Sequence, residues 1–340
     1  MNILYVGSCQ GFLEAGKSHY IPKKLVNGFT RNGHNVFCFN DRDFARYSNI
    51  FRSRKWGIAP LNKKLIEICE EFAPDLIVLG HCEMIWNRSL KAIRAVCPGV
   101  KIVYRNVDPL IHAQNVKDIS RRIGFVDGIF VTTAGDALKQ FSSAEGFVAF
   151  MPNPVDRAID TGRSFENDCP TDLFFAGGPL GVEDARRDLV KALMSKRPGL
   201  KLSVHGCGVN KDYLFGKAYM NSLAQSKMGL CLNRTYDYYW YSSDRMTQYM
   251  GNGLVTFLQR GTGFEAFFGE DDLAFYADEG ELLQKIDAFL ADDARRVLVA
   301  ENGWRKVHEA FSAEKVTQYI LDTTFGLEPA YDYCWPMARY

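Results

Sequence analysis

The sequence lacks paired cysteines and an excess of charge of one sign. Its nine cysteines include no CxxC pair, and several stand inside apolar segments. This pattern favours reduced, mostly buried thiols over a disulfide framework or a zinc site. Lys and Arg number 41 against 40 Asp and Glu, a formal net charge of +1. Such a balance excludes a general electrostatic attraction for nucleic acid, so any basic site must be local.

Long apolar runs are also missing. No stretch approaches the roughly 18 residues that a membrane-spanning helix requires. The chain begins with the strand-like segment N-I-L-Y-V-G (2–7), which leaves no room for a signal peptide ahead of it. We therefore expect a cytoplasmic protein that does not span a bilayer, while peripheral contact at the inner face of the membrane stays open.

What the sequence does contain is a regular alternation of apolar, strand-like segments with helical ones. In the first half the strand-like segments are 2–7, 35–40, 76–81, 100–106, 128–133 and 147–151. The helical patterns between them include 20–32, 60–72 and 88–96. Strands that are apolar along their length are typical of a parallel sheet with helices on both faces. The first half therefore predicts one Rossmann-like domain of six strands.

Two prolines mark the boundary between the halves. In M-P-N-P-V-D (151–156) they stiffen an extended connection that cannot continue a helix. The alternation then restarts, and a chain of 340 residues is long enough for two domains. We predict an α/β fold of two Rossmann-like domains facing a central cleft. The predicted division is 1–151, 152–322 and an aromatic tail, 323–340, which packs back on the first domain.

Turns of the second half place polar groups at the carboxyl ends of strands, where open α/β sheets bind ligands. In F-A-G-G-P-L-G (175–181) the glycines would bring backbone amides near a phosphate, although such a turn is often purely structural. Arg245 stands in the first turn of a helix, where a cation opposes the helix dipole. A bound anion would explain this choice, and a surface ion pair is the alternative. Gln248 lies one turn on, on the same helix face.

The turn Q-R-G-T-G-F-E (259–265) is a second glycine-rich candidate, whose amides would hold a diphosphate. Glu265 would lie near a sugar or ribose hydroxyl, or act only as an acid at a helix N-terminus. The aromatic loop 236–241 suits stacking on a ring of the ligand or packing inside the protein. His205, at a strand end, would donate to a phosphate or a base, or be structural. The candidate binding residues of this half are Gly177, Gly178, Gly181, Arg186, His205, Asn233, Arg234, Arg245, Gln248, Gly261, Thr262, Gly263 and Glu265.

Three candidate catalytic residues follow strands of the first half. Glu14 lies in the loop after the first strand, His81 ends the segment 76–81, and Asp108 stands in R-N-V-D-P-L-I-H. These loops would share one edge of the sheet. A general base, or a donor to a sugar hydroxyl, needs such a position. Capping and structural roles compete for each residue.

Taken together, these segments resemble the GT-B glycosyltransferases and, within them, the CgeB-type, group 1 transferases. The resemblance is carried by N-I-L-Y-V-G, F-F-A-G-G with the following R-R, Y-M-N-S-L-A-Q-S-K-M-G-L-C-L-N (219–233), D-R-M-T-Q-Y-M-G-N-G (244–253) and W-R-K-V-H-E-A-F-S (304–312). It covers nearly the full second half, but only the architecture of the first. In the related family 4 transferases, two glutamates eight residues apart contact the sugar and the ribose. Trp240 and Gln248 take those places here, and the neutral amide would hold a ribose diol less strongly.

The resemblance implies an enzyme that moves a sugar from a nucleotide-sugar donor, held by the C-terminal domain, to a glycan, lipid-linked or protein acceptor. The expected setting is cell-surface polysaccharide or glycoconjugate synthesis. Because the sequence lacks a DxD-type motif in a suitable loop, we expect no metal and no cofactor, the nucleotide sugar being a substrate. Nucleic acid is not an expected partner. A nucleotide-sugar 2-epimerase on the same fold, or a non-catalytic sugar-binding or scaffold protein, remains as an alternative.

Overall fold

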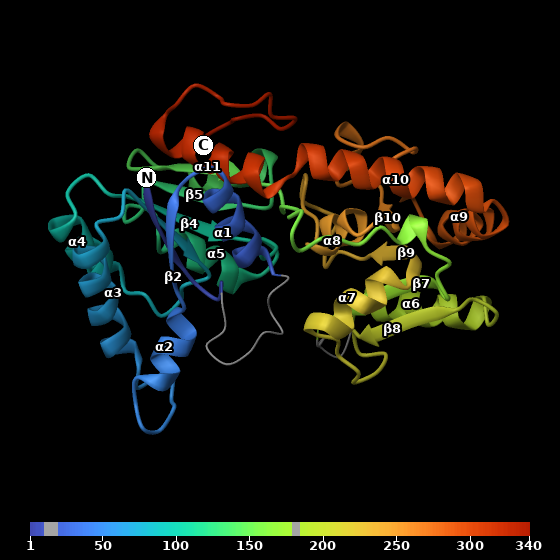
Figure 1. The fold of residues 1–340 in the computed structure, drawn as a ribbon, viewed down its shortest axis with the longest axis horizontal. Coiled ribbons are helices and arrows are strands. Elements are labelled where there is room, and N and C mark those ends of the chain that lie inside the picture. Colours follow the sequence, from blue (N-terminus) through green and yellow to red (C-terminus); the bar gives the residue numbers. More distant parts are fainter. Residues whose placement is uncertain (10–19, 179–183) are drawn as a thin grey trace. The chain divides into compact units, whose positions relative to one another are not determined.

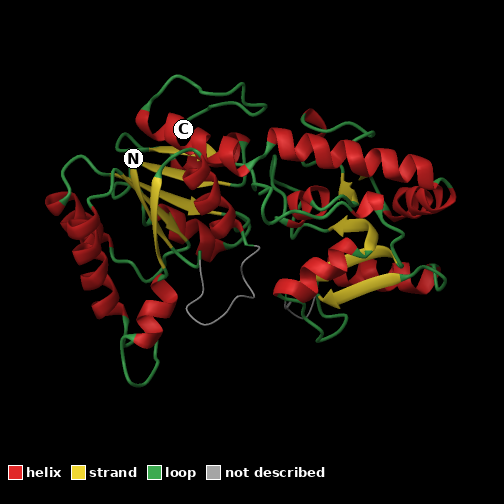
Figure 2. Cartoon of the chain, viewed as in Figure 1, coloured by secondary structure: helices red, strands yellow, loops and turns green. Residues whose placement is uncertain are grey.

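The computed structural model describes residues 1–9, 20–178 and 184–340. The chain divides into two compact units, residues 1–154 with 313–340, and residues 155–312. Each unit is built on one parallel sheet flanked by helices (Figures 1 and 2). The predicted α/β class with two Rossmann-like domains is therefore confirmed.

The sheet of the first unit has the order β2-β1-β3-β4-β5-β6, with all neighbours parallel. Its strands are β1 (Asn2–Val6), β2 (Asn35–Phe39), β3 (Leu76–Gly80), β4 (Lys101–Asn106), β5 (Gly128–Val131) and β6 (Phe147–Phe150). The central strand β3 is buried along its whole length, because helices cover both faces of the sheet. The edge strand β2 differs, since its residues alternate between more and less exposed and Phe37 is 42% exposed.

The helices of this unit are α1 (Ile21–Arg31), α2 (Asp41–Tyr47), α3 (Ile58–Phe72), α4 (Asn87–Val96), α5 (Ala113–Ser120) and α11 (Ala313–Phe325), with a 3₁₀ helix at Gly135–Phe141. The sequence analysis predicts no helix at α2, which is only seven residues long. Its start is fixed locally, because the Asn40 side chain accepts a hydrogen bond from the Asp43 amide. Seven residues make only about two turns, which is too short to show a periodic apolar face.

Helix α11 belongs to the first unit, although the predicted division at residue 322 places it in the second domain. It packs directly on α1. A Cβ on Gly28 of α1 would lie 2.3 Å from the carbonyl oxygen of Ala313, so glycine permits the close approach. Asn32 donates to the Glu314 carbonyl at 2.9 Å and to the Thr317 hydroxyl at 3.1 Å. The chain therefore returns to the first unit at residue 313.

The residues after α11 also lie on the first unit. Trp335 is buried, and its ring lies edge-on to that of Tyr319 in α11 at 5.5 Å. The Tyr333 hydroxyl donates to the carboxylate of Asp322 at 2.7 Å. Tyr340 and Val148 of β6 exchange backbone hydrogen bonds of 3.0 Å. The tail is thus held by the packing of Trp335 on α11 and by the backbone pairing of Tyr340 with β6.

The sheet of the second unit has the order β11-β10-β9-β7-β8, again with parallel neighbours. Its strands are β7 (Thr171–Gly177), β8 (Leu202–Gly206), β9 (Ser226–Cys231), β10 (Val255–Gln259) and β11 (Ala274–Tyr276). Its helices are α6 (Ala185–Lys196), α7 (Gly216–Ala224), α8 (Arg245–Gly251), α9 (Glu279–Ala291) and α10 (Asp293–Ala310), with 3₁₀ helices at Ser164–Glu166 and Phe264–Ala266. The carboxyl ends of all five strands form one edge, where the candidate binding residues stand.

None of the helices within the described ranges combines the length and apolarity that crossing a bilayer requires. All nine cysteines carry free thiols, and six of them are buried. In the described part of the chain, no three side chains of the metal-binding types come together.

Candidate functional site

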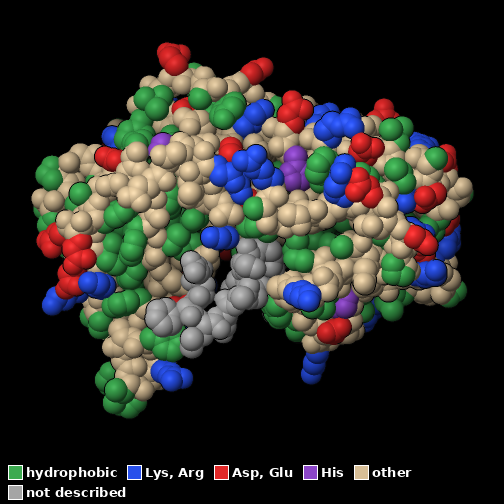
Figure 3. Space-filling model, in the orientation of Figure 1, with side chains coloured by type: hydrophobic (Ala, Val, Ile, Leu, Met, Phe, Trp, Pro, Cys, Tyr) green, Lys and Arg blue, Asp and Glu red, His purple; other side chains and the backbone are tan. Residues whose placement is uncertain are grey.

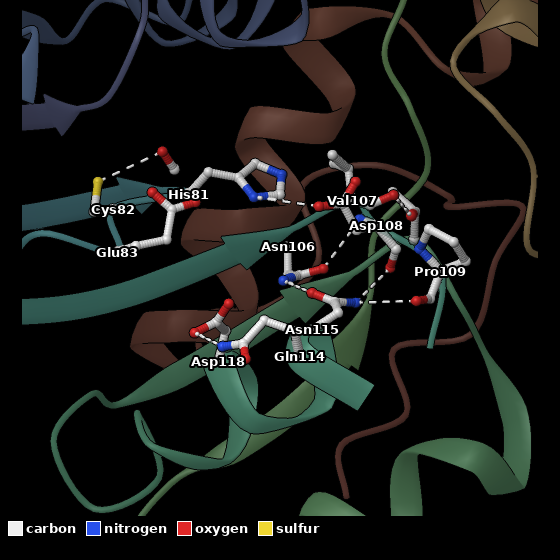
Figure 4. Close-up of polar contacts among 12 residues, drawn as sticks. His81, Cys82, Glu83, Asn106, Val107, Asp108, Pro109, Gln114, Asn115 and Asp118 are labelled. Carbon is white, nitrogen blue, oxygen red and sulfur yellow. Dashed lines mark hydrogen bonds and ion pairs between the residues drawn. The ribbon is translucent and has the colours of Figure 1, made fainter. Parts of the chain in front are cut away.

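His81 and Asp108 come together at the carboxyl edge of the first sheet (Figure 4). They follow β3 and β4, which are adjacent strands with Gly80 opposite Arg105. The His81 Nδ1 atom lies 3.8 Å from the Asp108 Oδ2 atom. The imidazole is mostly buried, whereas the carboxylate is 60% exposed. Two residues that the sequence analysis singles out separately therefore form a pair.

The backbone of His81 is held in an unusual conformation, with a φ of 51°. Left-handed backbone is uncommon for residues other than glycine, and it costs on the order of 1 kcal/mol or more. Directly before His81, a Cβ on Gly80 would lie 2.7 Å from the Tyr5 hydroxyl, so this turn is closely packed. The turn sets the direction of the imidazole.

Asp108 stands in a loop that two asparagines fix. The Asp108 amide donates to the Asn106 side chain at 3.0 Å, and the Asn115 side chain donates to the Asp108 carbonyl at 2.8 Å. Asn106 and Asn115 also bond to each other through their side-chain amides. Figure 4 shows this chain of contacts leading from α5 to the loop. The position of the carboxylate therefore depends on buried amides rather than on exposed loop residues.

The charge state of His81 follows from its surroundings. Burial lowers the pKa of His81 below 6.5, and the nearby Arg105 lowers it further, while Asp108 acts in the opposite direction. The imidazole is therefore neutral near pH 7. A neutral imidazole at a sheet edge, with a carboxylate beside it, can accept a proton and be stabilised once it is charged.

Arg105 and Asp41 are residues of this edge that the sequence analysis missed. Arg105 is only 2% exposed, and its Nε and Nη1 atoms make no hydrogen bond of standard geometry within the described residues. Asp41, the first residue of α2, is fully buried, and both its carboxylate oxygens lack such partners there. Burial raises the pKa of Asp41 to about 7. The available signal for Arg105 was a charged residue inside the apolar strand 100–106.

A pocket of about 470 Å³ opens at the carboxyl edge of the second sheet. It is lined by Asp184, Ala185, Arg186, Leu189, Leu232, Asn233, Arg234, Tyr236, Gln259, Tyr276, Asp278 and Glu279. Three of the predicted binding residues, Arg186, Asn233 and Arg234, thus share one cavity. The pocket lies over the N-termini of α6 and α9, where helix dipoles favour negative charge.

The two pocket arginines differ in their surroundings. Arg186 is 6% exposed and makes a two-point ion pair with Asp184, through its Nε atom at 2.9 Å and its Nη2 atom at 2.7 Å. The hydrogen bond from Arg186 is the main reason why the pKa of Asp184 is lowered. Arg234 is exposed and lies in the loop after β9, where it lines the pocket. A ligand anion would therefore meet Arg234 more readily than Arg186.

Arg245 spans the ends of two strands. Its Nη2 atom donates to the Leu232 carbonyl at 2.6 Å, its Nη1 atom lies 3.4 Å from the Ala176 carbonyl, and the guanidinium lies 5.7 Å from the centre of the Phe175 ring. Its buried Nε atom has no hydrogen-bond partner in the described ranges. Carbonyl oxygens are neutral acceptors, so they leave the charge of Arg245 unbalanced by a bonded carboxylate.

Gln248 and His205 are both occupied by protein partners. Gln248 accepts from the Tyr219 hydroxyl at 2.6 Å and donates to Asp244 at 3.1 Å. The ring nitrogens of His205 lie 2.9 Å from the Ser203 hydroxyl and 3.0 Å from Asp212. In this arrangement both side chains serve the local structure, and their contact with a ligand stays a prediction.

The turn at residues 261–263 is pinned by Trp240. The Trp240 amide donates to the Thr262 carbonyl at 2.6 Å, and its indole donates to the Gly263 carbonyl at 3.0 Å. Gly261 and Gly263 have φ values of 98° and 81°, which require glycine. The Thr262 hydroxyl is buried without a partner in the described part of the chain. Glu265 lies 3.4 Å from the Gly261 amide, so it closes the turn.

The aromatic loop is divided between packing and exposure. The Trp240 ring is buried, stacked on Tyr239 at 4.7 Å and lying 4.5 Å from Phe267. Tyr239 is 47% exposed. Trp240 therefore has a packing role in the structure, while Tyr239 presents an open ring. Among the remaining predicted residues, Gly177 is the last residue of β7 and Gly178 follows it, whereas Glu14 and Gly181 lie outside the described residues.

Comparisons with known proteins agree with this architecture. Residues 186–322 match a family described as glycosyl transferase-like. The sucrose-phosphate synthase of Thermosynechococcus elongatus is similar over 96% of this chain and 98% of its own, with a TM-score of 0.59 and 12% identity. The Anabaena protein HepE in complex with UDP-glucose is similar over 96% of this chain and 100% of its own, with a TM-score of 0.55 and 13% identity. The α,α-trehalose 6-phosphate synthase of Burkholderia multivorans is similar over 96% of this chain and 98% of its own, with a TM-score of 0.59 and 12% identity. No curated protein sequence matches the chain.

Proposed function

Since the chain has the fold of the GT-B glycosyltransferases and a glycosyl transferase-like segment at residues 186–322, we propose that it transfers a sugar from a nucleotide-sugar donor without a metal ion. The acceptor would be a glycan, a lipid-linked sugar or a protein, in cell-surface polysaccharide or glycoconjugate synthesis. The observation that carries this proposal is Arg245, whose guanidinium stands at the carboxyl edge of the second sheet and has only carbonyl partners among the residues that the structure describes.

On the donor side, Arg245 would bind the diphosphate. Negative charge grows on this group as the sugar leaves, and a preorganised cation in a water-poor site stabilises that charge. The amides of the 261–263 turn and the end of β7 at Gly177 would add hydrogen bonds. The pocket lined by Arg234 and Asn233 would receive the rest of the nucleotide sugar. The complex of HepE with UDP-glucose makes a uridine nucleotide the first donor to test.

On the acceptor side, His81 would take the proton of the attacking hydroxyl. Its lowered pKa keeps the imidazole neutral and ready to accept a proton near pH 7. Asp108, 3.8 Å away, would stabilise the imidazolium that forms. Glu14 stays a candidate for the same role. The geometry is compatible with acid–base work by His81 and Asp108 together.

A thermal-shift panel tests the proposal directly. UDP-, GDP-, CMP- and dTDP-sugars are added to the purified protein, first without metal and then with magnesium. Stabilisation by one nucleotide class, unchanged by magnesium, is the expected result, because binding to the folded state alone raises the melting temperature. The absence of a shift with all four classes would instead favour a non-catalytic scaffold.

Product analysis separates the two enzymatic alternatives. The stabilising donor is incubated with the protein in the absence of any acceptor, and the sugar nucleotide is recovered. A transferase leaves the stereochemistry at the second carbon of the sugar unchanged. An epimerised sugar nucleotide would identify a 2-epimerase and would overturn the proposed transfer reaction.

A further inference from the structure

The segment that joins α2 to α3 exposes three large apolar side chains. Ile50 is 91% exposed, Phe51 67% and Trp56 68%. These residue types are usually buried, so three of them within seven positions form an unusual surface. We call residues 50–56 the apolar tip. Figure 3 shows hydrophobic and basic side chains together at the end of this segment, which Figure 1 locates below α2.

The apolar tip is a built structure. The Asn49 side chain donates to the carbonyls of Ala45 and Ser53 at 2.9 and 2.8 Å, and accepts from the Ser53 amide at 3.1 Å. Gly57 approaches the Ala45 backbone so closely that a Cβ would lie 1.8 Å from its carbonyl oxygen. These contacts close the segment on itself at its base. The apolar side chains are therefore held outward by a satisfied backbone.

The charge around the tip has one sign. Between Asp43 and Glu67 the sequence contains no acidic residue and six basic ones, Arg46, Arg52, Arg54, Lys55, Lys63 and Lys64. Lys63 and Lys64 pair with Glu67 at 3.8 and 3.2 Å. For the four arginines and lysines nearer the tip, the described residues provide no ion pair. Because the whole chain has a net charge of only +1, this is a local concentration of positive charge.

We propose that the apolar tip docks on a bilayer that contains anionic phospholipids. Exposed aromatic and aliphatic side chains enter the boundary between headgroups and acyl chains, and flanking Arg and Lys bind anionic headgroups. The tip carries only positive charge, so two tips that faced each other would repel, whereas an anionic bilayer attracts the tip. This inference does not rest on sugar transfer, because the apolar tip contains none of the candidate site residues.

Sedimentation with vesicles tests the proposal on the full-length protein. The vesicles contain phosphatidylcholine alone or with about a third of phosphatidylglycerol, at low and at high salt. Stronger binding to the anionic vesicles, weakened by salt, is the expected result. Equal binding to both, or binding to neither, would overturn the proposal.

Two sets of substitutions separate the apolar and the charged contributions. The triple change Ile50→Ser, Phe51→Ser and Trp56→Ser should weaken binding to anionic vesicles by at least tenfold. The triple change Arg52→Gln, Arg54→Gln and Lys55→Gln should weaken it by about a hundredfold, since each basic residue near the surface contributes roughly fivefold. The control for exposed apolar surface is Leu298→Ser, at a side chain that is 57% exposed in the second unit. Equal effects of the control and the triple changes would overturn the proposal.

Light scattering and donor binding complete the design. If the tip mediated self-association, the wild-type protein would form a concentration-dependent dimer that the apolar triple change abolishes, which would overturn the membrane proposal. Stabilisation of the same variants by the nucleotide sugar should stay unchanged. If the wild-type protein binds the donor but not the vesicles, the result counts against the tip alone. If the donor does not stabilise the wild-type protein, the result counts against the proposed function alone.

Discussion

Asp41 should make the stability of the protein depend on pH in an unusual direction. Burial raises the pKa of this carboxyl from 3.8 to about 7 in the folded protein. The folded state therefore binds more protons than the unfolded state between these values, and stability falls as the pH rises from about 4 to about 7. A difference of roughly three pH units corresponds to about 4 kcal/mol. The penalty is fully present above pH 7.

Asp41→Asn removes this titration while keeping the size of the side chain. The unfolding free energy of the variant minus that of the wild type should be about 4 kcal/mol larger at pH 8 than at pH 4. About 2.5 kcal/mol of this increase falls between pH 5 and pH 8. Comparing the two proteins at each pH cancels the constant cost of the buried amide. The pH dependence of the difference is therefore the informative quantity.

Urea unfolding at pH 5, 6, 7 and 8, followed by circular dichroism, measures this difference. The matched control is Asp136→Asn, at a carboxylate that is 87% exposed and paired with Lys139. The control should give the same small effect at every pH. Parallel stability curves for Asp41→Asn and the wild-type protein would refute the reasoning, because they would show that Asp41 is ionised in the folded state throughout this range.

Four further predictions concern the two units. Arg245→Ala should raise the dissociation constant of the donor about a hundredfold, because a charge-assisted contact with the diphosphate is lost. An unchanged dissociation constant would show that Arg245 does not bind the donor. His81→Asn should lower kcat by a factor of at least about a hundred and abolish the acid limb of the pH–rate profile, which in the wild type should lie below pH 6.5. Arg105→Gln should move that limb to higher pH, since Arg105 lowers the pKa of His81. An unmoved limb would show that Arg105 does not influence the pKa of His81. Gly28→Val should lower the melting temperature by several degrees in thermal denaturation, because a Cβ would meet the Ala313 carbonyl at 2.3 Å, and an unchanged value would show that α1 and α11 can separate freely.

The strands could be predicted from the sequence because most of their residues are apolar and form continuous runs. Their order could not be predicted. That β3 and β4 are neighbours, and that His81 and Asp108 consequently form a pair, depends on crossover connections that leave no local pattern. The same holds for α11, whose partner α1 lies almost 300 residues away in the sequence. Long-range packing therefore decided both the pairing of the candidate catalytic residues and the extent of the first unit.

Residue type alone also could not show which polar side chains are already occupied. Gln248 and His205 have the chemistry of ligand-binding residues, yet Tyr219, Asp244, Ser203 and Asp212 supply their hydrogen bonds. Arg105 shows the opposite error. It looks like an anomaly in an apolar strand, and its buried guanidinium influences the protonation of His81.

The return of residues 313–340 to the first unit has a consequence for synthesis on the ribosome. Residues 1–154 emerge early, but the face of α1 that receives α11, and the β6 backbone that pairs with Tyr340, stay uncovered until residues 313–340 have been synthesised. The second unit, which is continuous in sequence, has all its residues available first. A premature stop codon after residue 312 would thus leave the second unit whole and the first unfinished, and an affinity tag fused after Tyr340 would start beside β6.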